Sequence, residues 1–550
     1  MCSRLAATGP LETVFVAGGW RAAAAVDAFQ VVDPSTGAAR PALWPVSGWA
    51  DVHLALDAAV QAAAEMRTIP DAIRGEFLEG YARRLEARAG ELVAAAHAET
   101  GLPVKPRLAD AEMPRMLDQL RQAAAAAREG TWRMAMIDAT KNIRSAAFGL
   151  GPVVVFPPAN FPFAYGCVTG GDFAAAIAAG NPVIAKAHPG HPSVSRIAAE
   201  EAAVALAEAG LPPAAVQLLH GIPLADGERI VADPRVAATG FTGSQQAGRR
   251  LFAAAASAGK VMWVEMGSVN PVVLLPGAVA ERGAQIADDL TAAVTGSAGQ
   301  VCIKPGAVFL VDDAAGRAFV AAAAERFCGV GPQVLLNPPG RDRLLASLAA
   351  LREAGAALVA GAETPRPPPA GPCTTLPTLW ETTGADLIAD AASLLVEAFG
   401  NATLVVKCAS LDELARAVAC VPGALAASVY AAHDGRDAQA FAAIAPLLVA
   451  TAGRVVENRM TTGMAVTPPM QHGGPWPSAA PPFYSAVGMP WSILRFARRI
   501  CFDGWSEPHL PEIVRDAAPP GGPWRFIDGA WTRGAVAAHG DPADLTPRGR

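Results

Sequence analysis

The segment from Pro152 to Lys186, PVVVFPPANFPFAYGCVTGGDFAAAIAAGNPVIAK, establishes the architecture of this chain. A short apolar run rich in β-branched residues is followed by an alanine-rich helical stretch and then by a second apolar run. Strands are predicted at 153–156, 182–185, 216–219, 237–241 and 261–264, with helices near 172–179, at 193–209, around 226 and from 244. This spacing indicates a parallel sheet covered on both faces, a doubly wound α/β fold.

The regions on either side of this segment differ in texture. Residues 51–130 are rich in Ala, Glu and Arg and are predicted to be helical. Residues 270–456 alternate again, with apolar runs at 272–275, 308–311 and 404–406, which indicates a second α/β domain. A proline-rich stretch at 365–372 is expected to be a loop, and the Gly/Pro-rich tail beyond residue 518 is expected to fray.

Composition excludes several classes of protein. With 52% hydrophobic and 17% charged residues over 550 positions, the chain has a large buried interior and is not disordered. A net charge of −6 without a basic cluster argues against a nucleic-acid partner. The eight cysteines are dispersed without a CxxC pair, which predicts reduced thiols in a cytoplasmic protein. Two charge-poor stretches, 145–171 and 460–494, contain several prolines, so no membrane span is expected.

A nucleophile and a base are the strongest chemical candidates. Cys302 ends the run Gly299-Gln300-Val301-Cys302, which contains a flexible glycine. Glu265 interrupts an apolar strand just before Gly267. A thiol and a carboxylate, each near a glycine, suit covalent catalysis through a thioester. The alternative for Cys302 is an inert packing residue.

Two turns follow predicted strands. Asn160 lies in a proline-rich loop, where its carboxamide is placed to donate to an oxyanion; an Asx turn is the alternative. Gly243, Ser244 and Gly248 lie where a strand gives way to a helix, and helix N-termini favour a pyrophosphate. Ser244 is expected to cap that helix, although a simple packing turn is the alternative.

Two further segments carry polar groups at strand ends. Lys186 and His188 are placed to hold a ribose or a phosphate; His191 follows, but without a third ligand no metal is expected. Glu397 precedes Phe399 in Glu-Ala-Phe-Gly, where the carboxylate is a candidate for ribose binding. The alternative for Glu397 is a surface carboxylate beside a core phenylalanine.

Taken in order, these segments resemble the aldehyde dehydrogenase superfamily over roughly residues 12–500. Within it, the segments 160–164, 186–192, 270–277, 470–475 and 510–529 look like the NADP-linked branch that contains α-ketoglutarate semialdehyde (2,5-dioxovalerate) dehydrogenases. The resemblance implies a dinucleotide-binding domain of residues 12–127 and 149–264 and a catalytic domain of residues 265–460. It also implies a small β oligomerisation element, 128–148 with 485–530, a flexible tail at 531–550, and a homodimer or homotetramer.

The resemblance also implies roles for the candidates. Cys302 attacks the aldehyde, Asn160 and the Cys302 backbone N–H hold the oxyanion, and Glu265 activates the water that cleaves the thioester. Lys186 and Ser244 bind the adenosine ribose or phosphate and the pyrophosphate. Glu397 positions the nicotinamide ribose, and Phe399 shapes the ring pocket.

Cofactor and substrate are less constrained. Pro189 stands where NAD-preferring relatives often carry glutamate, so a 2′-phosphate is not repelled and NADP is expected, with NAD tolerated. Asn401, Lys304 and the run 457–461 depart from the branch pattern. Arg459 in that run is a candidate for binding a carboxylated substrate, with a surface salt bridge as the alternative.

Three other functions are alternatives to the oxidation of a small semialdehyde. One is oxidation of medium or long aliphatic aldehydes. A CoA-acylating enzyme is disfavoured because Glu265 suits hydrolysis. A catalytically silent structural relative is disfavoured because Cys302, Glu265 and Asn160 are all present.

Overall fold

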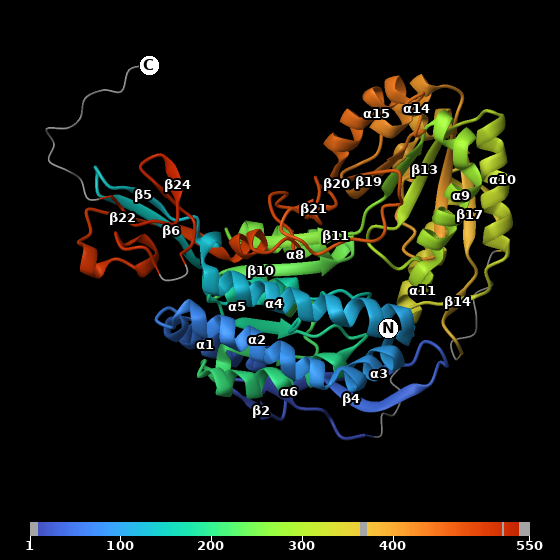
Figure 1. Ribbon diagram of the computed structural model, residues 1–550. Coiled ribbons are helices and arrows are strands. Elements are labelled where there is room, and N and C mark those ends of the chain that lie inside the picture. Colours follow the sequence, from blue (N-terminus) through green and yellow to red (C-terminus); the bar gives the residue numbers. More distant parts are fainter. Residues whose placement is uncertain (1–8, 363–370, 520–521, 538–550) are drawn as a thin grey trace, which may run out of the picture.

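The computed structural model describes residues 9–362, 371–519 and 522–537 of the chain. Within these ranges, three larger sheets build three bodies (Figure 1). The first sheet has eight strands in the order β2-β1-β9-β8-β7-β10-β11-β21. Its strands are β1 (Val14–Val16), β2 (Gly19–Arg21), β7 (Val153–Phe156), β8 (Val183–Lys186), β9 (Val216–Leu219), β10 (Ala238–Gly243), β11 (Val261–Met266) and β21 (Ala479–Ala480).

The centre of this sheet, from β9 to β11, is parallel as predicted. Its edges are not, because β1 and β21 pair antiparallel with β9 and β11. The central strands are apolar runs buried on both faces, which is typical of parallel sheets. The edge strands are too short to give a periodic signal in the sequence.

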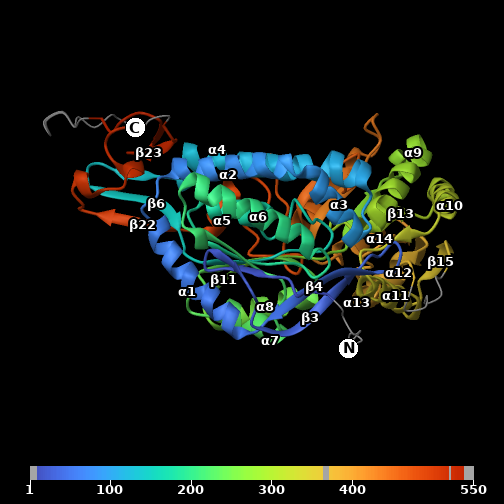
Figure 2. The same ribbon diagram turned by 90° about the horizontal axis from the view of Figure 1, so that it is seen from below.

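Helices cover both faces of the first sheet, which confirms the doubly wound fold (Figure 2). One face carries α1 (Trp49–Met66), α7 (Leu224–Ala232) and α8 (Gln245–Ser257). The other carries α5 (Gly171–Ala178) and α6 (Pro192–Ala209), with α2 (Asp71–Ala87), α3 (Ala89–Thr100) and α4 (Met113–Glu129) packed outside them. A two-stranded ribbon, β3 (Ala25–Val32) and β4 (Ala39–Ser47), precedes α1 where no strand was expected.

The second sheet has seven strands in the order β15-β17-β18-β13-β12-β19-β20 and is parallel except for β15. Its strands are β12 (Asn270–Leu274), β13 (Pro305–Val311), β15 (Ala357–Ala360), β17 (Thr378–Thr383), β18 (Ala402–Cys408), β19 (Ala424–Tyr430) and β20 (Ala452–Glu457). One face is covered by α9 (Pro276–Thr295) and α10 (Ala314–Cys328). The other is covered by α11 (Pro338–Glu353), α12 (Gly384–Ala389), α13 (Ala391–Leu394), α14 (Leu411–Ala419) and α15 (Ala438–Thr451). Most of the proline-rich stretch expected as a loop at 365–372 lies outside the described residues.

The third sheet projects from the rest of the molecule (Figure 1). Its order is β22-β6-β5-β23-β24. Its strands are β5 (Met136–Asp138), β6 (Ile143–Gly149), β22 (Ala497–Asp503), β23 (Arg525–Ile527) and β24 (Ala530–Thr532).

The strand β24 corrects the expectation of a flexible tail from residue 531. Asp528 and Gly529 have φ angles of 45° and 91°, so they form the two-residue turn that joins paired strands. The Trp531 ring then packs 5.5 Å from the Phe526 ring. The remainder of the expected tail, residues 538–550, lies outside the described residues.

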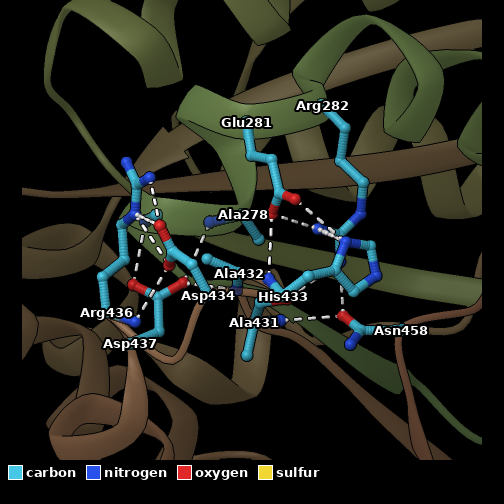
Figure 3. A network of polar contacts seen from close by, with 11 residues as sticks. Ala278, Glu281, Arg282, Ala431, Ala432, His433, Asp434, Arg436, Asp437 and Asn458 are labelled. Carbon is cyan, nitrogen blue, oxygen red and sulfur yellow. Dashed lines mark hydrogen bonds and ion pairs between the residues drawn. The ribbon is translucent and has the colours of Figure 1, made fainter.

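A polar network ties the carboxyl ends of β19 and β20 to α9 (Figure 3). The Asp437 carboxylate accepts hydrogen bonds from the backbone N–H groups of Gly277 and Ala278, both at 2.9 Å. Arg282 donates to the Asn458 side chain at 2.6 Å. The network therefore fixes the backbone immediately before Arg459.

None of the described helices is long and apolar enough to cross a membrane.

Candidate active site

The carboxyl ends of the central strands in the first sheet carry most of the predicted groups. Asn160 follows β7, Lys186 ends β8, Ser244 follows β10, and Glu265 lies at the end of β11. Parallel strands bring these ends to one edge of the sheet, where open α/β sheets bind ligands. This edge faces the second sheet, which supplies Cys302.

Cys302 lies in a tightly held connection between α9 and β13. Ser297, Ala298 and Gly299 take successive positive φ angles of 52°, 52° and 67°. The Asn270 side chain donates to the backbone oxygens of Cys302 and Lys304, both at 2.9 Å. These two bonds hold the backbone of Cys302 and of the residue two positions after it against the second sheet.

A histidine that the sequence did not single out completes the site. The Cys302 Sγ lies 3.4 Å from His472 Nε2. On the other side of the ring, Nδ1 lies 3.1 Å from Glu265 Oε1, within ion-pair distance but outside hydrogen-bond geometry. The side chains of His472 and Glu265 are almost fully buried. The structure therefore brings Cys302, His472 and Glu265 into one row.

Charges in this row are coupled. Burial raises the pKa of the Cys302 thiol, and the neighbouring His472 opposes that shift. Burial lowers the pKa of His472, but Glu265 and Cys302 outweigh it and raise that pKa to about 10. His472 thus holds a proton between two acidic groups at neutral pH.

The same three side chains are a candidate metal-ligand set. Within the described residues, Glu265, Cys302 and His472 each offer a ligand atom, and these atoms lie within 4.8 Å of one another. A sulfur, a nitrogen and an oxygen donor suit a soft divalent ion such as Zn²⁺.

Asn160 contacts the segment that precedes Cys302. Its Nδ2 donates to the backbone oxygen of Gln300 at 2.9 Å, two residues before Cys302. Arg107 donates to the Asn160 backbone oxygen at 2.8 Å and so steadies the loop. Because a carboxamide has two N–H donors, one remains for a ligand.

A cavity of about 850 Å³ runs from this site between the two sheets. Its lining includes Asn160, Lys186, His188, Gly243, Ser244, Glu265, Cys302, Arg343, Glu397 and Phe399. A cavity of this size, with a helix N-terminus at one wall and a thiol at one end, fits a nicotinamide dinucleotide. Arg343 was not expected from the sequence, because it comes from α11 in the second body.

Gly243, Ser244 and Gly248 have separate surroundings. Ser244 caps α8, accepting a hydrogen bond from the Ala247 N–H at 3.3 Å, as predicted. Gly243 lines the cavity beside it. Gly248 is not among the lining residues; a Cβ there would lie 2.7 Å from the Met266 side chain, so this glycine lets α8 pack closely on β11.

Lys186 and His188 enter the cavity with different charges. Burial lowers the pKa of Lys186 to about 8. Burial, aided by His191 and Lys186, lowers the pKa of His188 well below its usual value. His188 Nδ1 accepts from the Gly190 N–H at 3.0 Å, and its ring stacks 5.4 Å from that of His191. Of the two predicted residues, Lys186 is therefore the one that brings positive charge.

Glu397 is half-buried in the lining of the same cavity. Burial raises its pKa to about 7, against the effect of Lys304. A Cβ at Gly267 would overlap the Glu397 carboxylate, so this glycine is required for the close approach. Lys304 donates to the backbone oxygens of Ala402 and Pro305 and thereby joins β13 to β18.

Asn401 and Arg459 lie at the other two departures from the branch pattern. Asn401 accepts from Thr375 at 3.0 Å and donates to Gln333 at 3.1 Å, so it supports the strands around it. Arg459 is exposed and follows the carboxyl end of β20. Cys302 lies at the amino end of the neighbouring strands, at the opposite edge of the same sheet. The structure does not bring Arg459 to the thiol, and its role in substrate binding stays a prediction.

Comparisons with known proteins agree with this geometry. Residues 20–480 match the model of the aldehyde dehydrogenase family. Alpha-ketoglutaric semialdehyde dehydrogenase 2 of Azospirillum brasilense is 36% identical over 88% of this chain and 93% of its own length. Alpha-ketoglutaric semialdehyde dehydrogenase of Acinetobacter baylyi is 31% identical over 85% of this chain and 89% of its own length.

Solved structures show the same fold. A lactaldehyde dehydrogenase superimposes with a TM-score of 0.76 at 21% identity, covering 91% of this chain and all of that one. An aldehyde dehydrogenase from Pseudomonas syringae, solved with NAD⁺ and octanal, gives 0.75 at 22% identity, covering 91% and 98%. The chain belongs to the aldehyde dehydrogenase family and is an oxidoreductase that oxidises an aldehyde with a nicotinamide cofactor.

Proposed function

We propose that the protein oxidises a small semialdehyde such as α-ketoglutarate semialdehyde to the carboxylic acid. The observation that carries the proposal is the row Cys302–His472–Glu265, which ends the cavity between the two sheets. The two relatives above, both named for α-ketoglutaric semialdehyde, support the choice of substrate.

The reaction begins when the Cys302 thiolate bonds to the aldehyde carbon. The Asn160 carboxamide and the Cys302 backbone N–H donate to the oxygen that becomes negative, and each such donor contributes about 3 kcal/mol. His472 carries a proton beside the sulfur and favours its thiolate form. When bound, the nicotinamide ring accepts the hydride that leaves the former aldehyde carbon.

The second half of the reaction releases the acid. Water bonds to the thioester carbon and the carbon–sulfur bond breaks. Glu265 takes the proton of the attacking water as a general base. The electron pair of the broken bond stays on sulfur, where the His472 proton lies within reach.

The cofactor is proposed to be NADP, with NAD tolerated. Lys186 and Arg343 are cationic groups in the cavity wall, and the exposed Pro189 leaves no carboxylate there to repel a 2′-phosphate. His188 adds a hydrogen-bonding group without a charge. The nicotinamide end is proposed to lie at Glu397 and Phe399, which line the cavity, with the Glu397 carboxylate close to Gly267.

Longer aliphatic aldehydes are the alternative substrates. Phe161, which directly follows Asn160, shares one apolar cluster with Tyr165, Met464, Val466 and Met470, and none of these five residues lines the cofactor cavity. Such a wall suits an alkyl chain as well as a short semialdehyde.

The division of the chain is part of the proposal. We propose a dinucleotide-binding domain of 12–127 and 149–264, a catalytic domain of 265–460 and an oligomerisation element of 128–148 with 485–530, a division that the presence of three larger sheets supports. Trp505, Trp524 and Trp531 on the projecting element are 43–50% exposed, which supports a homodimer or homotetramer built through it. The cysteines that the structure describes are all free, in keeping with a cytoplasmic protein.

An aldehyde panel with both cofactors tests the proposal. Wild type is expected to form NADPH with short semialdehydes, and Cys302→Ala is expected to form none. Glu265→Gln is expected to retain a single burst of hydride transfer but to turn over slowly. The mechanism is wrong if the burst is lost as well, or if Cys302→Ala keeps its activity.

A further inference from the structure

An arginine on the substrate side has no counter-ion. Arg115 lies in the first turn of α4, and its Nε and Nη2 are buried. Among residues 9–362, 371–519 and 522–537, these two nitrogens have no hydrogen-bond partner, and no carboxylate forms an ion pair with Arg115. Further along the same helix, Arg121 pairs with Glu86 at 2.6 Å and Arg128 pairs with Glu79 at 3.7 Å.

The surroundings of Arg115 hold the cation but do not neutralise it. Its Cζ lies 5.5 Å from the centre of the Phe161 ring and 5.3 Å from that of the Tyr165 ring. The Tyr165 hydroxyl is also buried and has no partner of hydrogen-bond geometry in the described chain. Arg115 is half-buried, but its Nε and Nη2 and the Tyr165 hydroxyl are buried without acceptors, which is costly, so an anion that arrives from outside is favoured here.

Arg115 and its aromatic neighbours are connected to Cys302 through His472. The Tyr165 ring lies 5.9 Å from the His472 ring, whose Nε2 is 3.4 Å from Cys302 Sγ. Phe161 directly follows Asn160. Neither Arg115 nor these two aromatic residues line the cofactor cavity, although the adjacent Asn160 does. The positive charge is close enough to Cys302 to lower its pKa.

The other arginines nearby are engaged or distant. Arg107 stacks 4.2 Å from the Phe161 ring, but it is paired with Glu112 at 2.5 Å and donates to the Asn160 backbone. Arg459 lies at the opposite edge of the second sheet. Arg115 is therefore the available cation beside Cys302 in the part of the chain that the structure describes.

We propose that Arg115, helped by the Tyr165 hydroxyl, forms a subsite for the carboxylate at the far end of the substrate. The ligand class is a short aldehyde that ends in a carboxylate, and this assignment rests on the proposed function. A guanidinium offers a planar pair of N–H donors to a carboxylate, which a neutral alkyl chain cannot use. The apolar cluster then holds the methylene groups between the two ends of the substrate.

The test compares 5-oxopentanoate with pentanal, which have the same number of carbons but differ in the terminal carboxylate. In Arg115→Gln, the ratio of kcat/KM for 5-oxopentanoate over pentanal is expected to fall about 10- to 100-fold, as for loss of a charged hydrogen bond. Tyr165→Phe is expected to lower the same ratio by less. Arg121→Gln, on the same helix, is the matched control and is expected to leave the ratio unchanged.

A binding measurement separates this proposal from the proposed function. Glutarate, the product of 5-oxopentanoate, is expected to protect Cys302 of wild type from iodoacetamide more strongly than pentanoate does, and Arg115→Gln is expected to abolish that difference. If wild type oxidises neither aldehyde but glutarate still protects, the proposed function fails and the subsite stands.

Three outcomes overturn the subsite. In the first, the kcat/KM ratio of 5-oxopentanoate over pentanal and the protection by glutarate are both unchanged in Arg115→Gln. In the second, that ratio falls in Arg459→Gln instead. Alternatively, Arg115→Gln slows both aldehydes equally, which would place its effect on the thiol and not on the carboxylate.

Discussion

Replacing His472 by glutamine tests how the nucleophile is activated. The imidazole Nε2 lies 3.4 Å from Cys302 Sγ, and His472 is protonated at neutral pH because its pKa is raised to about 10. Glutamine keeps a hydrogen-bonding group but removes the charge. A hydrogen bond to a charged group contributes about 1.5–3 kcal/mol, and about 1.4 kcal/mol corresponds to one pKa unit. The pKa of Cys302 is therefore expected to rise by about one to two units in the variant.

The assay is the rate of Cys302 alkylation by iodoacetamide between pH 6 and 10, followed on the peptide that contains this residue. Following the peptide matters because Cys328 and Cys501 are exposed and also react. Because the thiolate is the reactive form, the profile of His472→Gln is expected to move to higher pH, with a rate about 10- to 100-fold lower at neutral pH. His433→Gln, an exposed histidine paired with Glu281, is the control and is expected to follow wild type. A His472→Gln profile that superimposes on wild type would refute the reasoning.

The remaining predictions concern stability, the cofactor site and metal sensitivity. Since the pKa of His472 is raised on folding, its stabilising effect is complete below its ordinary pKa of about 6.5 and is lost as pH rises through about 10; the Tm difference between wild type and His472→Gln is expected to shrink across that window, and a constant difference would contradict the ion pair. Gly267→Ala is expected to displace Glu397 and raise the KM for the cofactor about 10-fold, whereas Gly296→Ala, where a Cβ meets open space, is expected to change nothing; equal KM values in the two variants would remove the steric argument. Zn²⁺ is expected to inhibit reversibly and to protect Cys302 from alkylation, and both effects are expected to weaken in His472→Gln; inhibition of equal strength in the variant would place the ion elsewhere.

Local patterns in the sequence predicted most of the central strands and helices. The predicted strands at 153–156 and 216–219 coincide with β7 and β9, and Ser244 caps α8 as expected. These features depend on neighbouring residues: buried parallel strands are continuous apolar runs, and a serine before a helix satisfies a free N–H. The edge strands and β24 were missed because they are short and are held by partners elsewhere in the chain.

The polar side chains at the carboxyl ends of the strands could also be predicted from the sequence. Asn160, Lys186 and Glu265 were each predicted at or after a strand, and parallel strands gather their carboxyl ends at one edge of the sheet. The structure places all three in one cavity wall and adds Cys302 from the second sheet. Their catalytic and binding roles remain predictions for the variants above.

Residue order along the chain thus predicts the central strands and the candidate nucleophile and base of this aldehyde dehydrogenase. The contact between Cys302 and His472, 170 positions apart, and the unpaired charge of Arg115 emerge after folding. The reason is physical. Both depend on how loops and helices from separate bodies pack around the thiol, and on whether that packing brings a carboxylate to each buried cation. No local pattern records which charges remain without a partner once the interior is closed.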